Sequence, residues 1–462
     1  MEVTQAISNI VSVTPWSRQI YHDANSFWRE SRGLHHAYMV YRTLRGEYKH
    51  IFQPDAVFYV GKSPAAYLKK VKTKKISDED IRQWQRFLWN QAVVPLLIVK
   101  SPTQIHVYTA YTKPEKKDSQ QRIQAILEYV ADTLKLDQLW TAIESGMIYR
   151  QRPEAFLRDN AVDQCLLDNL KATALQLANT QPGKTKEEKE NNLKFAHHFL
   201  TRLLFICYLI ERGMIGKHFN DTEHEILKKL KPANHTEGGY FLSHLFNDLD
   251  SISKKRNALC RIFGYVKRMF NGSLFPESIT SESSRYSDDF IKIINKFLNG
   301  EEIRTGQRVL GFWAYDFSVI PIETISAIWE SFLGEQGKLR EVQGDTDSKR
   351  ATGAYYTPLH LAELTVDVAL ENITEKTGKQ IHELIILDPA CGSGVFLVSM
   401  FCRIAESFYR KTQRTRGIEW ARKLKPKLKQ LYGVDISDTA YHITCFSLYL
   451  AYLEWLEPKD VE

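Results

Sequence analysis

A seven-residue turn between an apolar run and a helix-like stretch constrains this chain most. It reads Asp388-Pro389-Ala390-Cys391-Gly392-Ser393-Gly394. Residues 384–387 before it are typical of a buried strand, and residues 395–400 after it are typical of a helix. Gly392 and Gly394 allow positive φ and a close approach to a ligand, while Ser393 and the amides opening the helix can donate to a carboxylate. The turn predicts a ligand-cradling loop of a doubly wound α/β sheet, with an ordinary strand-to-helix turn as the alternative.

Two flanking segments provide context for this turn. Upstream lies Gly353-Ala354-Tyr355-Tyr356-Thr357-Pro358, and Pro358 suits the first turn of a helix through residue 370. Downstream, residues 431–436 indicate a second short strand that ends in Asp435, the position of an acid that binds ribose hydroxyls in doubly wound sheets. Asp435 follows Gly394 by 41 residues, where a compact unit needs about 20. We therefore expect an extra helix over residues 418–430.

Together these three segments resemble the amino-directed DNA methyltransferases, most closely the adenine-specific enzymes of type IIG restriction-modification systems. In that family Tyr-Thr-Pro precedes the first strand, Asp-Pro-Ala-Cys-Gly-Ser-Gly follows it, and Gly-Val-Asp-Ile ends the next. The resemblance implies a Rossmann-like domain that binds S-adenosyl-L-methionine. It implies that Tyr356, Thr357 and Pro358 line the cofactor pocket, that Asp435 holds the ribose and that Ile436 lies against the adenine ring. The amino-acid end of the cofactor would be cradled by Asp388, Pro389, Ala390, Cys391, Gly392, Ser393 and Gly394.

The residues that would carry out methyl transfer are not found. Transfer to an exocyclic amine needs hydrogen-bond acceptors for that amine and an aromatic ring for the extruded base. The family supplies them as Asn/Asp-Pro-Pro-Tyr/Phe, but the chain contains no Pro-Pro dipeptide, so we predict no catalytic residues. The sequence also ends 27 residues after Asp435, inside an expected helix over residues 442–456. We expect a second polypeptide, or a missing segment, to supply the motif, the remaining strands and a target-recognition domain.

The N-terminal region resembles the nuclease domain of type IIG enzymes and type I restriction subunits. Its pattern predicts a helix over residues 34–44, strands over 54–60 and 65–70, and a hairpin formed by 94–100 and 105–108. Such PD-(D/E)xK nucleases bind a divalent metal through an Asp and a later Glu-x-Lys. Asp55 matches the first acid, but neither Lys69 nor Lys70 has a carboxylate two residues before it. We therefore predict a degenerate domain without a metal site; misalignment, or a live nuclease that uses a displaced acid such as Glu47, stays open.

These observations divide the chain of 462 residues into three expected domains. They are a degenerate nuclease-like α/β domain over residues 1–118, a helical connector over 119–345, and a partial methyltransferase sheet over 346–462. Within the connector, residues 181–190 are expected to form a mobile polar loop before a core helix over 196–213. Arg202 interrupts the apolar run of that helix, which is then well short of the length that a membrane span requires. The pair His197 and His198 is expected to be structural.

The charge and the cysteines bear on the kind of partner and on the cellular compartment. The net charge is +7, and nine basic residues against one acid lie between residues 410 and 429. A second cluster consists of Lys62, Lys69, Lys70, Lys72, Lys74 and Lys75. Contact with duplex DNA and a solvated face are both open for each cluster. The six cysteines form no Cys-x-x-Cys pair, which suits a reduced cytoplasm. Cys391 is expected to pack rather than react.

Three functions follow as hypotheses. The first is the cofactor-binding portion of an adenine-specific DNA methyltransferase in a restriction-modification or phage-defence system. The second is a non-catalytic DNA- and cofactor-binding subunit of a defence complex. The third is a DNA endonuclease with a regulatory S-adenosyl-L-methionine domain. Duplex DNA is the expected substrate or ligand in all three.

Overall fold

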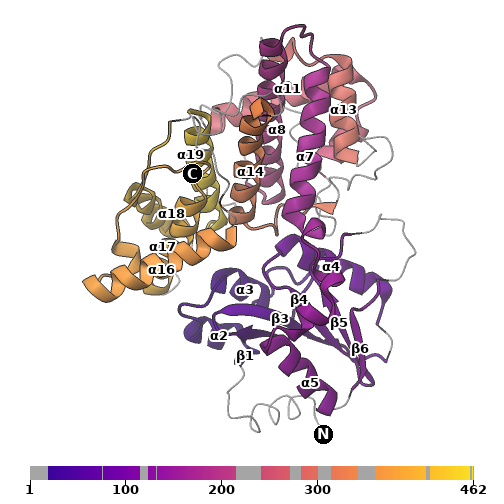
Figure 1. Cartoon of the computed structure of the whole chain (residues 1–462), viewed down its shortest axis with the longest axis vertical. Coiled ribbons are helices and arrows are strands. Elements are labelled where there is room, and N and C mark those ends of the chain that lie inside the picture. The colour runs from indigo at the N-terminus through magenta and orange to yellow at the C-terminus, as the bar shows by residue number, and fades with distance from the viewer. Residues whose placement is uncertain are drawn as a thin grey trace. The chain divides into compact units, whose positions relative to one another are not determined.

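The computed structural model of the chain resolves into two compact units, Met1–Cys165 and Leu166–Glu462 (Figure 1). The structure describes residues 19–74, 76–114, 123–131, 133–214, 241–270, 282–299, 314–341, 357, 359–412, 417–436, 438–457 and 460. One sheet has six strands and another has two, and most of the remaining described residues are helical. The expected mixed α/β class is confirmed.

The first unit is built on a six-stranded sheet with the strands in sequence order. The strands are β1 (Gln19–Tyr21), β2 (Ala56–Val60), β3 (Ser63–Lys70), β4 (Leu96–Lys100), β5 (Gln104–Thr109) and β6 (Leu127–Val130). Neighbouring strands are antiparallel except β3 and β4, which run parallel because the helix α4 (Asp78–Gln91) forms the crossover between them. The expected strands are confirmed, and so is the hairpin expected across residues 101–104, although its second strand already begins at Gln104.

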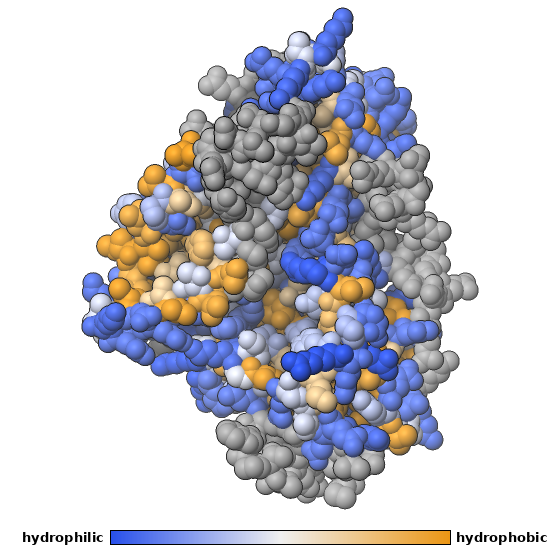
Figure 2. All heavy atoms as spheres, in the orientation of Figure 1, coloured by the Kyte–Doolittle hydropathy of each residue, from blue (hydrophilic) through white to orange (hydrophobic). Residues whose placement is uncertain are grey.

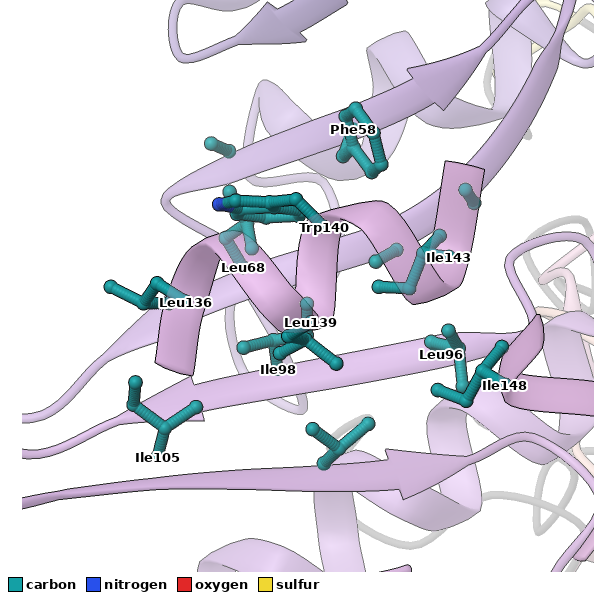
Figure 3. Close-up of a cluster of buried hydrophobic side chains, with 14 residues drawn as sticks. Phe58, Leu68, Leu96, Ile98, Ile105, Leu136, Leu139, Trp140, Ile143 and Ile148 are labelled. Atoms are coloured by element: carbon teal, nitrogen blue, oxygen red, sulfur yellow. The ribbon is translucent and has the colours of Figure 1, made fainter. Parts of the chain in front are cut away.

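One buried cluster of the first unit lies between one face of this sheet and the helix α5 (Thr133–Glu144), as Figure 3 shows. Trp140 of α5 meets Phe58 edge to face, with the ring centroids 4.8 Å apart. Leu68 and Ile98 lie under the same helix. Around the sheet are the shorter helices α2 (Ala24–Glu30), α3 (Ala37–Leu44), α6 (Met147–Gln151), η1 (Pro153–Phe156) and η2 (Arg158–Asn160). The expected helix over residues 34–44 is α3.

The second unit begins with a helical part. Its helices are α7 (Val162–Asn179), α8 (Lys186–Glu211), α10 (Phe241–Asn247), α11 (Ile252–Phe270), α13 (Asp288–Asn299) and α14 (Ile322–Glu341). The expected core helix over residues 196–213 is confirmed as most of α8. The expectation of a loop up to residue 190 is wrong, because α8 begins at Lys186 and residues 186–190 are helical. Thr185 and Glu188 form a capping box that satisfies the first amides, a signal that the charged composition of this segment obscures.

The helix α8 is long and apolar enough for a membrane span by composition alone, but 78% of its apolar window is buried in the protein. Its one buried arginine, Arg202, is paired with Glu282, and Arg202 Nη1 donates to Glu282 Oε2 at 2.7 Å. His197 stacks on Phe332 with the ring centroids 4.1 Å apart. These contacts are those of a core helix, and His197 has the structural role expected of it.

The carboxyl-terminal part of the second unit contains a two-stranded parallel sheet, β7 (Ile386–Asp388) and β8 (Leu431–Gly433). The flanking helices are α16 (Leu359–Thr377), η4 (Ile381–Glu383), α17 (Val395–Lys411), α18 (Gly417–Leu424), η5 (Lys425–Gln430) and α19 (Asp438–Glu454). The extra helix expected over residues 418–430 is present in two pieces, α18 and then the 3-10 turn η5, which starts where Pro426 interrupts the α-helix.

One face of this small sheet is covered and the other is bare. Val366 and Leu370 of α16 and Met400 of α17 form a buried cluster against which Ile386 and Leu431 pack. The alternate side chains on the other face are exposed: Ile385 by 75%, Leu387 by 63%, Tyr432 by 55% and Val434 by 55%. Figure 2 shows apolar residues gathered on the surface over the region of α17–α19 in Figure 1.

The two expected domain boundaries can be compared with the structure. The strand β6 lies after residue 118, so that boundary falls before the last strand of the first sheet. The expected linker over residues 343–350 lies outside the described residues. The helical connector and the carboxyl-terminal sheet belong to one compact unit. The division into three domains stays a prediction.

Candidate cofactor site

The site is organised by the two parallel strands, whose carboxyl ends carry the predicted residues. Asp388 is the register partner of Gly433. Beyond the strands the pairing continues, since Val434 N donates to Asp388 O and Cys391 N donates to Val434 O, each at 2.9 Å. The glycine loop after β7 is therefore held against the segment after β8. This edge is where open parallel sheets bind their ligands.

Asp435 is joined directly to the glycine loop. Gly392 N donates to Asp435 Oδ2 at 2.9 Å, across 43 positions of sequence. Both residues are half-buried. A carboxylate that accepts a backbone amide is held in one orientation, and a charge-assisted hydrogen bond of this kind is about twice as strong as a neutral one. The structure thus brings the second and third of the three predicted ligand segments together.

Asp388 offers an acceptor that the protein leaves unused. Its Oδ1 accepts from Ala390 N at 3.1 Å and closes the turn. Its Oδ2 is buried and, among the residues that the structure describes, has no hydrogen-bond partner. Buried polar atoms are normally satisfied, and one that is not needs a cause such as a ligand. A ligand ammonium or hydroxyl would satisfy Oδ2.

Position 394 favours glycine for two reasons, a left-handed backbone conformation and the lack of space for a side chain. Its φ is +89°, and it is the residue before the first turn of α17. A Cβ atom placed there would lie 2.9 Å from Thr444 Cγ2 and 3.2 Å from Thr444 Cα. Since Thr444 is buried in α19, it cannot move aside. The helix α19 therefore fixes the far side of the loop.

Thr444 also bonds the loop, a role that the sequence did not indicate. Its Oγ1 donates to Gly392 O at 2.7 Å. Only a helical pattern marked residues 442–456, and a threonine in a helix usually bonds its own backbone. The bond from Thr444 to the loop becomes visible only when the two segments are packed together.

Ser393 faces the protein interior. Its hydroxyl donates to Ser326 O of α14 at 3.3 Å, and Ser326 Oγ donates back to Ser393 O at 3.5 Å. The side chain thus ties the loop to the helical part of the unit. The amides of Ala390, Cys391, Gly392 and Gly394 also donate within the protein. The donors that a ligand carboxylate could use are the first-turn amides of α17, which begins at Val395.

Cys391 packs rather than reacts. It is buried, and burial raises the pKa of its thiol, with the charges of Asp435 and Asp388 acting in the same direction. A Cβ atom on Gly433 would lie 3.0 Å from Cys391 Sγ and 2.9 Å from Leu397 Cδ1. A glycine at this position of β8 allows α17 and the loop to approach the strand.

The remaining predicted residues lie as follows. Pro389 and Ala390 are exposed at the tip of the loop, and Ile436 is 89% exposed just after Asp435. Thr357 is half-buried at the start of α16. Tyr356 and Pro358 lie outside the described residues. Of the predicted site residues, the structure therefore describes the loop, Asp435, Ile436 and Thr357.

The carboxyl-terminal part of the chain matches a known family. Residues 366–456 match the family model described as MmeI, DNA-methyltransferase domain. This range contains both strands, the glycine loop and Asp435. The chain resembles the restriction-modification methyltransferases. The family predicted from the three sequence segments is confirmed at this level.

Two curated proteins are similar to this chain over longer stretches than the family model. One, from Methanocaldococcus jannaschii, has a name that describes a type II restriction enzyme and methyltransferase; it is 23% identical over 362 residues, 66% of this chain. The other, DNA methyltransferase A of Bacillus subtilis, is 27% identical over 291 residues, 57% of this chain. Each match covers 28% of the relative's length. No solved structure matches.

Proposed function

We propose that this chain is the S-adenosyl-L-methionine-binding component of an N6-adenine DNA methyltransferase in a restriction-modification or phage-defence system. Its substrate would be duplex DNA in the cytoplasm. The hydrogen bond from Gly392 N to Asp435 Oδ2 is the observation that carries this proposal, because it joins two parts of a cofactor site from separate strands. The family match over residues 366–456 supports the same assignment.

Different residues would contact the amino-acid end, the ribose and the adenine ring of the cofactor. The unused Asp388 Oδ2 would accept from the ammonium of the cofactor's amino-acid end, and the first-turn amides of α17 would donate to its carboxylate. Asp435 would accept from the ribose hydroxyls while it continues to bind Gly392. The exposed Ile436 would lie against the adenine ring, and Tyr356, Thr357 and Pro358 would complete the wall. Pro389, Ala390, Cys391, Ser393 and Gly394 would shape the loop.

The chemistry follows from positioning. The cofactor supplies a methyl group on a sulfonium, and the protein holds that methyl in line with the attacking amine. The acceptors that orient the amine, and the ring that holds the extruded adenine, would come from a second polypeptide with an Asn/Asp-Pro-Pro-Tyr/Phe motif and a target-recognition domain. The bare apolar face of β7 and β8 supports this, since parallel sheets are stable when both faces are covered.

The first unit is proposed to be a degenerate PD-(D/E)xK nuclease domain. The antiparallel strands β1, β2 and β3, followed by α4 and the parallel strand β4, support this topology. Asp55 precedes β2 as the first acid of such a site would. Glu47, the displaced acid that a live nuclease could use, is paired with Arg42. The pairing argues against that alternative.

The test is a methyl-transfer assay on duplex DNA with radiolabelled cofactor. We expect no transfer by this chain alone. Transfer should appear when the chain is mixed with a polypeptide from the adjacent reading frame that carries the missing motif, and it should disappear with Asp435→Ala. Transfer by this chain alone would refute the split arrangement. Cofactor binding without transfer in any mixture would favour a non-catalytic subunit of a defence complex.

A further inference from the structure

A second cluster of charged residues lies in the first unit, at one edge of its six-stranded sheet. His22 follows the end of β1, Asp55 precedes the start of β2, and Lys70 and Lys100 are the last residues of β3 and β4. Because β2 runs antiparallel to both β1 and β3, and β4 runs parallel to β3, these four residues meet at the same edge. Each of the four neighbouring strands β1 to β4 thus contributes one charged or titratable residue to this edge.

Lys70 and Lys100 lie side by side on this edge. They are register partners across the parallel pair of β3 and β4. Each lies two residues after a core residue, Leu68 or Ile98, so both project from the face that α5 covers (Figure 3). In the part of the chain that the structure describes, no carboxylate lies within ion-pair distance of either ammonium.

The charge of Lys70 acts on both Lys100 and His22. The pKa of Lys100 is lowered by burial and then by the charge of Lys70. The pKa of His22 is lowered by burial and then by the same lysine. Two adjacent like charges are unfavourable unless an anion lies between or above them. The edge is therefore short of negative charge.

Asp55 offsets this positive charge only in part, since its effect in raising the pKa of His22 is smaller than the opposite effects of burial and of Lys70. Its Oδ2 accepts from the backbone of Lys70 at 2.6 Å, which fixes the carboxylate against the end of β3. Lys69 is turned away, since its Nζ donates to Gln53 O at 2.6 Å and lies over the ring of Trp84. Three acids open α4 nearby, Asp78, Glu79 and Asp80, of which Glu79 is paired with Arg82.

We propose that this edge binds a phosphate of the duplex DNA backbone through Lys70 and Lys100, at the place where a nuclease of this topology would hold a metal ion. One carboxylate with two ammonium groups beside it repels a divalent cation and attracts an oxyanion. Among the described residues, no group of three or more His, Cys, Asp or Glu side chains lies close enough together to hold a metal ion. Lys72 and Lys74, which follow β3 and are exposed, extend the positive edge. Lys62 belongs to the turn between β2 and β3 at the opposite edge.

The binding test uses the full-length chain, a fluorescent duplex of about 20 base pairs and a series of salt concentrations. The variant Lys70→Gln/Lys100→Gln should weaken binding about tenfold or more at low salt. It should also reduce the slope of log K against log salt by about 0.9, the change expected when one phosphate charge is no longer neutralised. Lys62→Gln is the matched control and should leave both unchanged. An unaltered slope in the double variant, or an equal loss in Lys62→Gln, would overturn the proposal.

Asp55→Asn distinguishes a phosphate site from a metal site by the sign of its effect. Asparagine keeps an acceptor for Lys70 N but removes the negative charge, so DNA should bind more tightly without added metal. If Asp55 held a metal, the same change would abolish magnesium-dependent cleavage or magnesium-dependent binding, and either loss would overturn the proposal.

Competition by inorganic phosphate tests whether the bound oxyanion is a free phosphate or a phosphate of duplex DNA. We expect it to compete weakly and only at high concentration, because it lacks the neighbouring phosphates that Lys72 and Lys74 would contact. Lysine-dependent binding of inorganic phosphate with no lysine-dependent binding of DNA would overturn the assignment to duplex DNA. S-adenosyl-L-methionine binding should be unchanged in every variant, which keeps this test separate from that of the cofactor site.

Discussion

Asp435 Oδ2 accepts a hydrogen bond from the backbone amide of Gly392 at 2.9 Å. The first of these residues follows β8 and the second follows β7, so one bond closes the site across the two parallel strands. It also gives Asp435 two roles, as an anchor of the loop and as the proposed ribose acceptor. Substitutions at this residue must therefore be designed to separate the two.

Gly394→Ala should destabilise the second unit and impair the cofactor site. The left-handed conformation at φ +89° costs about 1–2 kcal/mol for a residue with a side chain. Contact with Thr444 adds about 1–3 kcal/mol of overpacking. The measurement is chemical denaturation of the full chain, with cofactor binding followed in parallel.

Gly378→Ala is the matched control for that prediction. Gly378 also has a positive φ, of +66°, but among the residues that the structure describes nothing lies within 4 Å of an added Cβ. It should lose about 1–2 kcal/mol from backbone strain and retain cofactor binding. Equal losses in the two variants would show that Thr444 is not the obstacle at Gly394.

Thr444→Val should weaken cofactor binding several-fold and destabilise the chain by about 1–2 kcal/mol. Valine keeps the shape but leaves Gly392 O without the hydrogen bond that Thr444 Oγ1 donates. The control is Thr365→Val in α16, where the exposed hydroxyl donates within its own helix, to Leu361 O at 2.8 Å. If both variants bound the cofactor like the wild type, Thr444 would have no positioning role.

Glu323 should make the stability of the second unit depend on pH. Burial, and then the charge of Glu454, raise the pKa of this α14 carboxyl to about 7. A raised pKa in the folded state means that folding favours the protonated acid. The stabilisation is complete below the ordinary pKa near 4.5 and is lost as the pH rises through about 7. The neighbouring groups are Cys402 of α17, Glu363 of α16 and Arg212, which binds Glu454 at 3.1 Å.

Glu323→Gln should therefore stabilise the chain at pH 8 by about 2–3 kcal/mol and have little effect near pH 4.5. Denaturation of wild type and variant at several pH values measures the difference. Glu375→Gln, an exposed position on α16, should give a difference that does not change with pH. A constant difference for Glu323→Gln as well would contradict the assignment.

The elements that position the site could be predicted from sequence because their signals are local. The glycine turn, the short strand before Asp435 and the helix after Gly394 each follow from residue types within a few positions. The capping box at Thr185 is equally local, but the charged composition of residues 181–190 favours a loop and outweighs the Thr-x-x-Glu pattern. The expectation of a loop there was wrong for that reason.

The contacts that join these elements could not be predicted in the same way. Thr444 Oγ1 bonds Gly392 O across 52 positions, and Ser393 bonds Ser326 across 67 positions. Neither threonine nor serine in a helix carries a sign of its distant partner. The exposed residues on the bare face of β7 and β8, Leu387 and Tyr432 among them, became identifiable only once the strand register was known.

The most direct test of the cofactor site is calorimetric titration of the full chain with S-adenosyl-L-methionine. Wild type should bind the cofactor, and the affinity of Asp435→Ala should be lower by about tenfold or more. Asp435→Asn, which keeps an acceptor for Gly392 N, should have an intermediate affinity. Asp289→Asn, an exposed acid on α13, should match the wild type. Equal affinity in wild type and Asp435→Ala, or no binding by the wild type, would contradict the assignment of this site.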